Sequence, residues 1–188
     1  MTTGQTISLA ILESQIVEFR ALHPHLNVEL LVTGYIVDMH ADKIDQAIRP
    51  QAIHEECPGT EVIPLCDVGF AVYGSKNYLA KHGAPDSFDD IADHALVSHD
   101  KNALQYFSPL NWAAENLHPK TVPLTTNQVG VMIHAASQDL GLAVLPCFVS
   151  EKDDSLVRVI DETDELTLKL AIYVRDDIAD KTDAYTFV

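Results

Sequence analysis

Three short loops of this sequence carry polar side chains directly after apolar, strand-like runs. Open α/β sheets bind ligands at the carboxyl ends of their strands, where loops converge and helix amino termini point inward. This rule selects three groups of candidate binding residues, which are Thr33, Gly34 and Tyr35, then Ser98 and His99, and then Thr126, Asn127 and Gln128.

The third loop precedes an expected helix over residues 127–139. Unpaired N–H groups at a helix start, together with the positive end of the helix dipole, favour a carboxylate or a similar anion. Thr126 or Asn127 would then contact the ligand. From the residues alone, the favoured alternative is that one of these side chains caps its own helix.

The other two loops offer different contacts. Thr33 has a hydroxyl, Gly34 lets backbone approach closely, and Tyr35 has a ring that stacks and a hydroxyl that donates. The alternative there is an ordinary strand-to-helix turn. His99, beside Ser98 at a strand end, would sense protonation or bind an anion when charged, the alternative being a surface histidine with no role.

Arg49 is the only cation beside the third expected strand of the first half of the chain. A guanidinium binds a carboxylate through two parallel hydrogen bonds, so Arg49 is a natural partner for an anionic ligand. A neighbouring carboxylate such as Asp45 would serve it equally well. Both assignments stay open.

Patterns typical of enzymes are weak in this sequence. Ser98 and Lys101 have the Ser-x-x-Lys spacing, but that chemistry needs the serine to open a helix, and Ser98 ends an expected strand. There is no Gly-x-Ser-x-Gly elbow, no phosphate-binding glycine-rich loop and no His-Glu-x-x-His, and the nine histidines lack metal-ligand spacing. We therefore expect no enzyme, no metal and no cofactor.

Composition limits the partners and the compartment. With 12 Lys and Arg against 28 Asp and Glu, the net charge is −16, so this chain alone repels nucleic acid. The 188 residues suffice for one large domain or two small lobes. Because no membrane span or secretory signal is visible, we expect a cytoplasmic protein.

Three cysteines, Cys57, Cys66 and Cys147, argue against a disulfide framework, because the number is odd and no export signal accompanies them. Cys57 and Cys66 would lie close enough for a redox pair. The favoured alternative is two reduced thiols beside an apolar strand.

Strand-like runs alternate with helical patterns along the whole chain, which is the rhythm of an α/β protein. The expected strands are 6–11, 28–32, 46–48, 61–65, 68–74, 95–98, 121–125, 142–145, 156–160 and 166–174, and the expected helices are 12–23, 35–43, 77–82, 88–92, 127–139 and one that begins near 180. Residues 61–65 and 68–74 are nearly in line and predict one long path between two lobes.

Three blocks of sequence resemble the LysR-type transcription regulators. They are FRALHPHLNVELLVTGYIVDMHADKIDQAIRP from Phe19, EVIPLCDVGFAVYGSKNYLAKHGAPDSFDDIADHALVSHD from Glu61, and TTNQVGVMIHAASQDLGLAVLPCFVSEKDDSLVRVI from Thr125. The last block is the most specific, because a helix, Gly-Leu-Ala, an apolar strand and Pro follow in the order of that family. Together the blocks cover most of the chain.

The resemblance implies the effector-binding domain of such a regulator, with an α/β fold similar to the type II periplasmic solute receptors. Lobe I would be residues 1–67 and 170–188, and lobe II residues 68–169, with crossover strands between them. A small anionic or aromatic effector would bind in the cleft between the lobes. The family's amino-terminal winged helix-turn-helix, through which DNA would be bound, is missing from this sequence.

The same resemblance implies a homodimer or tetramer, with residues 28–32 and 127–139 supplying the contact surface. Between Gly4 and Phe19 the chain is shorter than the family by roughly one loop and a helical turn, so the first wall of the cleft would be rebuilt or absent. Two rival hypotheses are a free-standing solute receptor of the same fold and an α/β enzyme with an unrecognised site.

Overall fold

The chain passes between two structural units twice, each time inside a strand. The computed structural model describes residues 1–100, 107–161 and 163–178. Unit 1 comprises Met1–Cys66 and Lys169–Val188, and unit 2 comprises Asp67–Leu168. The long strand β4 (Thr60–Ser75) carries the chain into unit 2, and β9 (Thr167–Arg175) carries it back.

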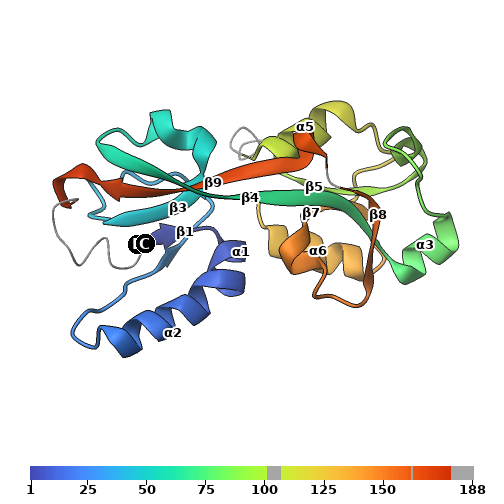
Figure 1. Ribbon diagram of the computed structural model, residues 1–188. Helices are drawn as coiled ribbons and strands as arrows, with labels where there is room; N and C mark the ends of the chain where they lie inside the picture. The colour runs from blue at the N-terminus through green and yellow to red at the C-terminus, as the bar shows by residue number, and fades with distance from the viewer. Residues whose placement is uncertain (101–106, 162, 179–188) are drawn as a thin grey trace. The chain divides into compact units, whose positions relative to one another are not determined.

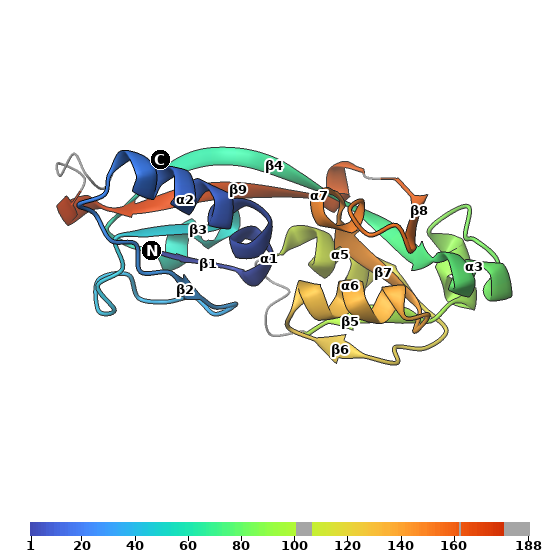
Figure 2. The ribbon, with the colours of Figure 1, turned by 90° about the horizontal axis from the view of Figure 1, so that it is seen from below.

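Unit 1 is built on a small mixed sheet in the order β2-β1-β3-β9. β1 (Thr2–Thr3) pairs in parallel with both β2 (Leu31–Val32) and β3 (Gln46–Pro50). β3 then pairs antiparallel with β9, as Figure 2 shows. All five residues of β3 are buried, which fits a strand with a neighbour on each side.

One continuous helical stretch covers this sheet. It runs through α1 (Gln5–Ile7), a π-helical turn (Ser8–Leu12) and α2 (Glu13–Leu22), and lies beside β1 and β3 in Figure 1. The core beneath it consists of Leu12, Ile48, Ile172, Val174 and Ile178. The expected strand 6–11 is therefore wrong, because Thr2–Thr3 supplies the strand and the apolar run after it forms the covering helix.

The helix expected over 35–43 is also wrong. Asp38 competes with helix formation, because its Oδ1 accepts hydrogen bonds from the backbone N–H groups of His40, at 3.0 Å, and Ala41, at 2.9 Å. Lys43 then adopts a φ of 54°, outside the helical region. A 3₁₀ helix, Gln51–Glu56, follows β3, and another, Asp176–Ile178, follows β9.

Unit 2 has its own mixed sheet in the order β4-β7-β5-β6, with β8 on the other side of β4. β7 (Leu142–Pro146) pairs antiparallel with β4 and parallel with β5 (Leu96–His99). β6 (Thr125–Thr126) extends the sheet in parallel to β5, and β8 (Leu156–Ile160) is antiparallel to β4.

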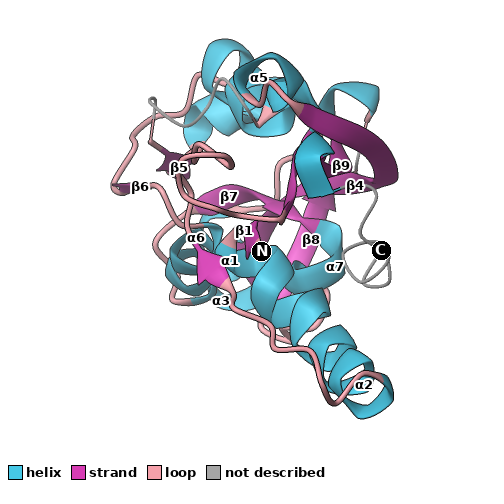
Figure 3. Ribbon diagram, turned by 90° about the vertical axis from the view of Figure 1, so that its left-hand side faces the viewer, coloured by secondary structure: helices cyan, strands magenta, loops and turns pink. Residues whose placement is uncertain are grey.

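Helices cover both faces of the unit 2 sheet. α5 (Ser108–Asn116) and α6 (Val129–Ser137) both contact β5 and β7, from opposite faces of the sheet (Figures 1 and 3). The shorter helices are α3 (Lys76–His82), α7 (Cys147–Ser150) and the 3₁₀ turns Asp89–Asp93 and Asp164–Leu166. No helix in the described part of the chain has the length and apolarity needed to span a membrane.

The helix expected to begin near residue 180 lies outside the described residues.

Candidate functional site

The nine candidate residues fall into two groups, one on each unit. Ser98, His99, Thr126, Asn127 and Gln128 lie in unit 2, and Thr33, Gly34, Tyr35 and Arg49 lie in unit 1.

The unit 2 group forms because β5 and β6 end side by side. Their parallel register pairs Ser98 with Thr125 and His99 with Thr126. The pairing continues for one step beyond β5, where the Asp100 N–H donates to the Thr126 carbonyl at 2.8 Å. The carboxyl ends of the two strands, and the start of α6 after them, therefore share one edge of the sheet.

The start of α6 is open to an external acceptor. Its N-cap residue, Gln128, is extended (φ −125°, ψ 114°), and no described side chain caps the helix. Thr126 Oγ1 instead accepts from the Gln128 N–H at 3.2 Å, one residue too early to serve the helix, while Asn127 is exposed. Within the first turn the Val131 N–H already donates to the Gln128 carbonyl at 3.0 Å, so the Val129 and Gly130 amides are the donors to which an anion would bind.

His99 is a buried residue of this group, with 4% of its surface exposed. Its Nδ1 lies 3.3 Å from the Asp100 carbonyl oxygen, and its ring lies against Phe107 with centroids 5.7 Å apart. Burial lowers the pKa of His99 below its ordinary value, so the ring is neutral at pH 7. His99 therefore presents a neutral imidazole ring to a ligand, and not a positive charge.

Arg49 organises the unit 1 group. Its guanidinium donates to the Thr33 carbonyl at 2.6 Å and to Thr2 Oγ1 at 2.8 Å, and only 7% of the residue is exposed. Burial lowers the pKa of Arg49 to about 10, so it stays charged at neutral pH. No carboxylate among the described side chains, Asp45 included, forms an ion pair with it.

The loop that Arg49 holds contains an ST turn, in which a threonine side-chain oxygen accepts a hydrogen bond from the backbone two residues later. Thr33 donates its N–H to the Thr3 carbonyl at 3.0 Å, and its Oγ1 accepts from the Tyr35 N–H at 3.2 Å. Tyr35 itself is 73% exposed. The hydroxyl of Thr33 is thus used locally, and the Tyr35 ring is the part of this loop most available to a ligand.

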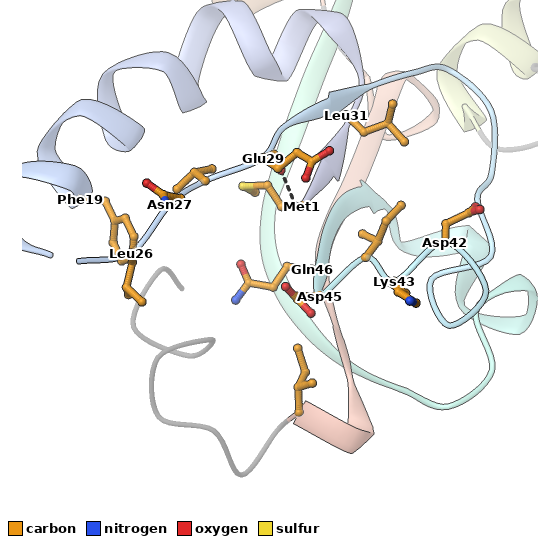
Figure 4. A pocket seen from close by; sticks show the side chains of 13 residues that line it. Met1, Phe19, Leu26, Asn27, Glu29, Leu31, Asp42, Lys43, Asp45 and Gln46 are labelled. Carbon is orange, nitrogen blue, oxygen red and sulfur yellow. Dashed lines mark hydrogen bonds between the residues drawn. The ribbon is translucent and has the colours of Figure 1, made fainter. Parts of the chain in front are cut away.

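A pocket of about 850 Å³ lies in unit 1, at the opposite ends of the same strands. Figure 4 shows Met1, Leu31 and Gln46, the amino-terminal residues of the β1, β2 and β3 region, around it together with Phe19 and Leu26. The Met1 amino group donates to the Glu29 carbonyl at 2.8 Å on its wall. The sequence rule that points to the carboxyl ends of strands could not have found this pocket.

One cluster brings possible metal-ligand atoms close together, but its side chains already form hydrogen bonds with other protein groups. Ligand atoms of His40, Asp176 and Asp177 lie within 4.8 Å of one another, all on exposed residues. His40 Nε2 is 3.0 Å from the Gly59 carbonyl oxygen, and Asp177 accepts two hydrogen bonds from Arg175, the shorter at 2.7 Å. These contacts explain the cluster without an ion.

Comparison with known proteins gives a consistent answer. The family model described as the LysR substrate binding domain matches residues 1–188. An uncharacterised HTH-type transcriptional regulator of Haemophilus influenzae is 25% identical over 162 residues, which are 82% of this chain and 54% of that protein. The regulator CrgA of Neisseria meningitidis is 25% identical over 137 residues, 72% of this chain and 45% of CrgA.

Solved structures share the fold. The regulatory domain of CrgA, a LysR-type transcriptional regulator from Neisseria meningitidis, superposes with a TM-score of 0.83 at 22% identity, covering 99% of this chain and 92% of that one. The effector domain of the regulator AmpR of Pseudomonas aeruginosa superposes with a TM-score of 0.75 at 22% identity, covering 100% and 90%. The chain spans about half the length of the curated relatives it matches.

Proposed function

Because the chain belongs to the family of LysR substrate-binding domains, we propose that it binds a small-molecule effector at the edge of unit 2 where β5, β6 and α6 meet. It is the effector-binding regulatory domain of a LysR-type transcription regulator, in a family that is not enzymatic. The fold is the α/β type of these regulatory domains, similar to the type II periplasmic receptors.

The observation that carries the site is the uncapped start of α6. The first-turn amides point out of a helix whose N-cap residue provides no side-chain acceptor, and Ser98 and His99 lie on the adjoining strand end. A carboxylate would accept from these amides, while the neutral His99 ring would favour an aromatic or flat portion of the same molecule. We therefore propose an anionic or aromatic effector.

In unit 1 we propose a contact through the Thr33-Gly34-Tyr35 loop, with the exposed Tyr35 ring against the effector and Arg49 as a positioning residue. Arg49 holds the loop through the Thr33 carbonyl instead of meeting the effector. The cleft expected between the two units stays a prediction.

The remaining partners are proposed from the family. The intact regulator would be a cytoplasmic homodimer or tetramer that binds DNA through an amino-terminal winged helix-turn-helix. The charge of −16 supports the last point, because this chain repels phosphate backbones. The rival hypotheses of an enzyme or a transport receptor lose their support, since the family model covers the whole chain.

A thermal-shift screen of small carboxylates and aromatic acids tests the proposal. A ligand at about 100 times its dissociation constant stabilises by about 2.7 kcal/mol, or roughly 2–4 °C for a chain of this size. The decisive variant is Val129→Pro. Proline is well tolerated at the first helical position and removes one amide donor, and the extended Gln128 before it suits a proline neighbour.

The matched control is Val129→Ala, which shortens the same side chain but keeps the N–H. We expect a carboxylate hit to lose its shift in Val129→Pro and keep it in Val129→Ala. Asn127→Ala tests the exposed side chain beside the helix start in the same way. If Val129→Pro folds normally and every hit keeps its full shift, the effector does not use the start of α6.

A further inference from the structure

His94 is a buried residue whose ring has a nitrogen without a hydrogen-bond partner. It lies between the 3₁₀ turn Asp89–Asp93 and β5 with 4% of its surface exposed, and among the described residues nothing bonds to its Nδ1. A neutral imidazole tolerates this position, because with its proton on Nε2 the Nδ1 atom is only an acceptor. In a protonated ring both nitrogens are donors, and a buried donor without an acceptor is destabilising. The packing around His94 therefore suits the neutral ring.

Tyr78 of α3 lies against the His94 ring. The two ring centroids are 5.8 Å apart, and Tyr78 is itself buried. The Tyr78 hydroxyl accepts a hydrogen bond at 3.0 Å from the N–H of Ala95, the residue directly after His94. A second imidazole, that of His82, also contacts the Tyr78 ring, with centroids 4.5 Å apart. Tyr78 therefore joins α3 to the segment that leads into β5, and two histidine rings lie on it.

The titratable groups that act on His94 come from α3 and from its own turn. Burial lowers the pKa of His94 below its ordinary 6.5, and His82 acts in the same direction. Asp93 and Asp90 act against them, but both carboxylates are on exposed residues. Lys120 contacts His94 through its backbone N–H, which donates to the His94 carbonyl at 2.9 Å. The ring is therefore neutral at pH 7.

α3 is also tied to the end of α6. Ser75 caps α3 by accepting from the Tyr78 N–H at 2.9 Å, and its own hydroxyl donates to Asp139 Oδ1 at 2.5 Å. Asp139 lies two residues after α6, and its Oδ2 is 3.7 Å from Lys81 Nζ at the other end of α3. The φ of Asp139 is 66°, a strained value that its surroundings must hold in place. The position of α3 therefore affects the end of α6.

We propose that His94 is an acid-sensitive switch in unit 2, and that protonation of its ring releases Tyr78 and loosens α3 from the start of β5. The closed packing gives a protonated ring no acceptor at Nδ1, whereas water satisfies that nitrogen once α3 has moved away. Acid would then be a second input to the regulatory domain. Its transmission through α6 rests on the proposed effector site, but the switch at His94 does not.

The direction of the effect follows from proton binding. In the open form, water surrounds His94 and the ring binds a proton near its ordinary pKa of 6.5. In the closed form the ring binds a proton only at a lower pH. The closed form is therefore fully favoured above pH 6.5 and becomes less favoured as the pH falls below that value. The opening equilibrium changes by up to about tenfold per pH unit.

Amide hydrogen exchange of the full chain, resolved by residue with NMR, tests the proposal. The reporter is the Ala95 N–H, because Tyr78 holds it. Between pH 6.5 and 5.5 its protection factor should fall by up to about tenfold in the parent protein and should stay nearly constant in His94→Leu, which cannot take up a proton. The internal control is the Thr33 N–H of unit 1, which donates to the Thr3 carbonyl and should respond alike in both proteins.

Two further variants separate the switch from simple packing. Tyr78→Phe removes the acceptor of the Ala95 N–H, so it should lower the protection of Ala95 at every pH, including pH 7.5. His82→Gln removes the second imidazole, so it should raise the pKa of His94 towards 6.5 and reduce the loss of protection in acid. The NMR titration of the His94 ring, measured in the parent and in His82→Gln, reports this pKa directly.

Three results overturn the proposal. One is a His94 ring in the parent protein that titrates at or above pH 6.5, a measurement that does not depend on the folding of any variant. Another is an equal acid-induced loss of protection at Ala95 in the parent and in His94→Leu. The third is unchanged protection of Ala95 in Tyr78→Phe, since Tyr78 would then not hold this segment. Failure of the effector screen leaves all three measurements unaffected, so the two proposals are tested separately.

Discussion

Burial decides how the two candidate residues that can carry a positive charge, Arg49 and His99, behave in the folded chain. Arg49 keeps its charge but directs it at a carbonyl and a hydroxyl of its own unit. His99 gives up its charge, because burial lowers its pKa. Arg49 and His99, which the sequence suggests as anion ligands, therefore act mainly as structural residues within their own units.

The state of His99 predicts a pH dependence of stability. Its pKa in the folded chain lies below the ordinary 6.5, so the unfolded chain binds a proton first as the pH falls. This contribution is fully present above pH 6.5 and is lost on acidification. We would measure the free energy of unfolding in denaturant titrations between pH 7.5 and 5.5. As the pH falls, the free energy of unfolding of His99→Gln should decrease less steeply than that of the parent protein, by up to about 1.4 kcal/mol per pH unit. A curve for His99→Gln that runs parallel to that of the parent protein would contradict the assignment.

Arg49 predicts a loss of stability on conservative substitution. Lysine carries the charge but cannot donate to the Thr33 carbonyl and Thr2 Oγ1 from a planar fork. We expect Arg49→Lys to lower the free energy of unfolding by about 1–3 kcal/mol, measured with urea. Arg20→Lys is the matched control, because Arg20 also bonds two carbonyls, those of His23 and Pro24, but is less buried. Equal effects of the two changes would mean that Arg49 does not hold the loop.

At the scale of elements, the sequence predicted best where an apolar run had clear ends. The expected path through 61–65 and 68–74 is confirmed as the single strand β4, and the helix over 77–82 ends as expected at Gly83, whose φ is 83°. The strands near 142–145, 156–160 and 166–174 are present as β7, β8 and β9. In each case, a turn residue or a change of period marks the boundary.

The errors have local physical causes. The strand expected at 121–125 is reduced to a bridge at Thr121 and the pair Thr125–Thr126, because Pro123 has no N–H to donate between them. The helix expected over 88–92 is a 3₁₀ helix, Asp89–Asp93, and no described side chain caps its start. Instead, Asp90 Oδ2 accepts from the Ser87 N–H at 2.9 Å and from its hydroxyl at 2.8 Å. Such side-chain competition cannot be read from periodicity.

The candidate site shows the same division. Parallel pairing of β5 with β6 is a consequence of strand order, so residues at both strand ends could be selected together from the sequence. The acceptors of Arg49 could not, because Thr2 belongs to a strand that was not predicted and the Thr33 carbonyl is backbone. The uncapped state of α6 also depends on where the helix starts, two residues later than expected.

The contact between β5 and β7 predicts the effect of a single methyl group. A Cβ added at Gly141, just before β7, would lie 2.7 Å from the carbonyl oxygen of Ala95 and 3.0 Å from its carbonyl carbon. These are backbone atoms of a paired segment, so they cannot move aside cheaply. Gly141→Ala should lower the free energy of unfolding by about 1–3 kcal/mol. Gly4→Ala, with nothing within 4 Å, is the control and should change little.

At the scale of the whole molecule, the net charge of −16 has consequences for stability in salt. Self-repulsion among carboxylates destabilises the compact state, and salt screens it as the Debye length falls from about 30 Å at 0.01 M to about 8 Å at 0.15 M. We expect the melting temperature to rise by a few degrees, roughly 2–4 °C, over that range. Differential scanning fluorimetry in sodium chloride measures it, with sucrose as the uncharged comparison. A flat response to salt would show that the carboxylates are already balanced locally.

The order of the units along the chain also shapes how this protein is made. Unit 2 is one uninterrupted stretch, Asp67–Leu168, whereas unit 1 needs β9 to complete its sheet beside β3. The partner of Ala47 in that sheet is Tyr173, so the ribosome must add well over a hundred residues before the pair can form. During synthesis we expect unit 2 to fold before unit 1 is complete. Until β9 is made, β3 has an unpaired edge, and we expect this edge to be the part of the nascent chain that is most prone to aggregation.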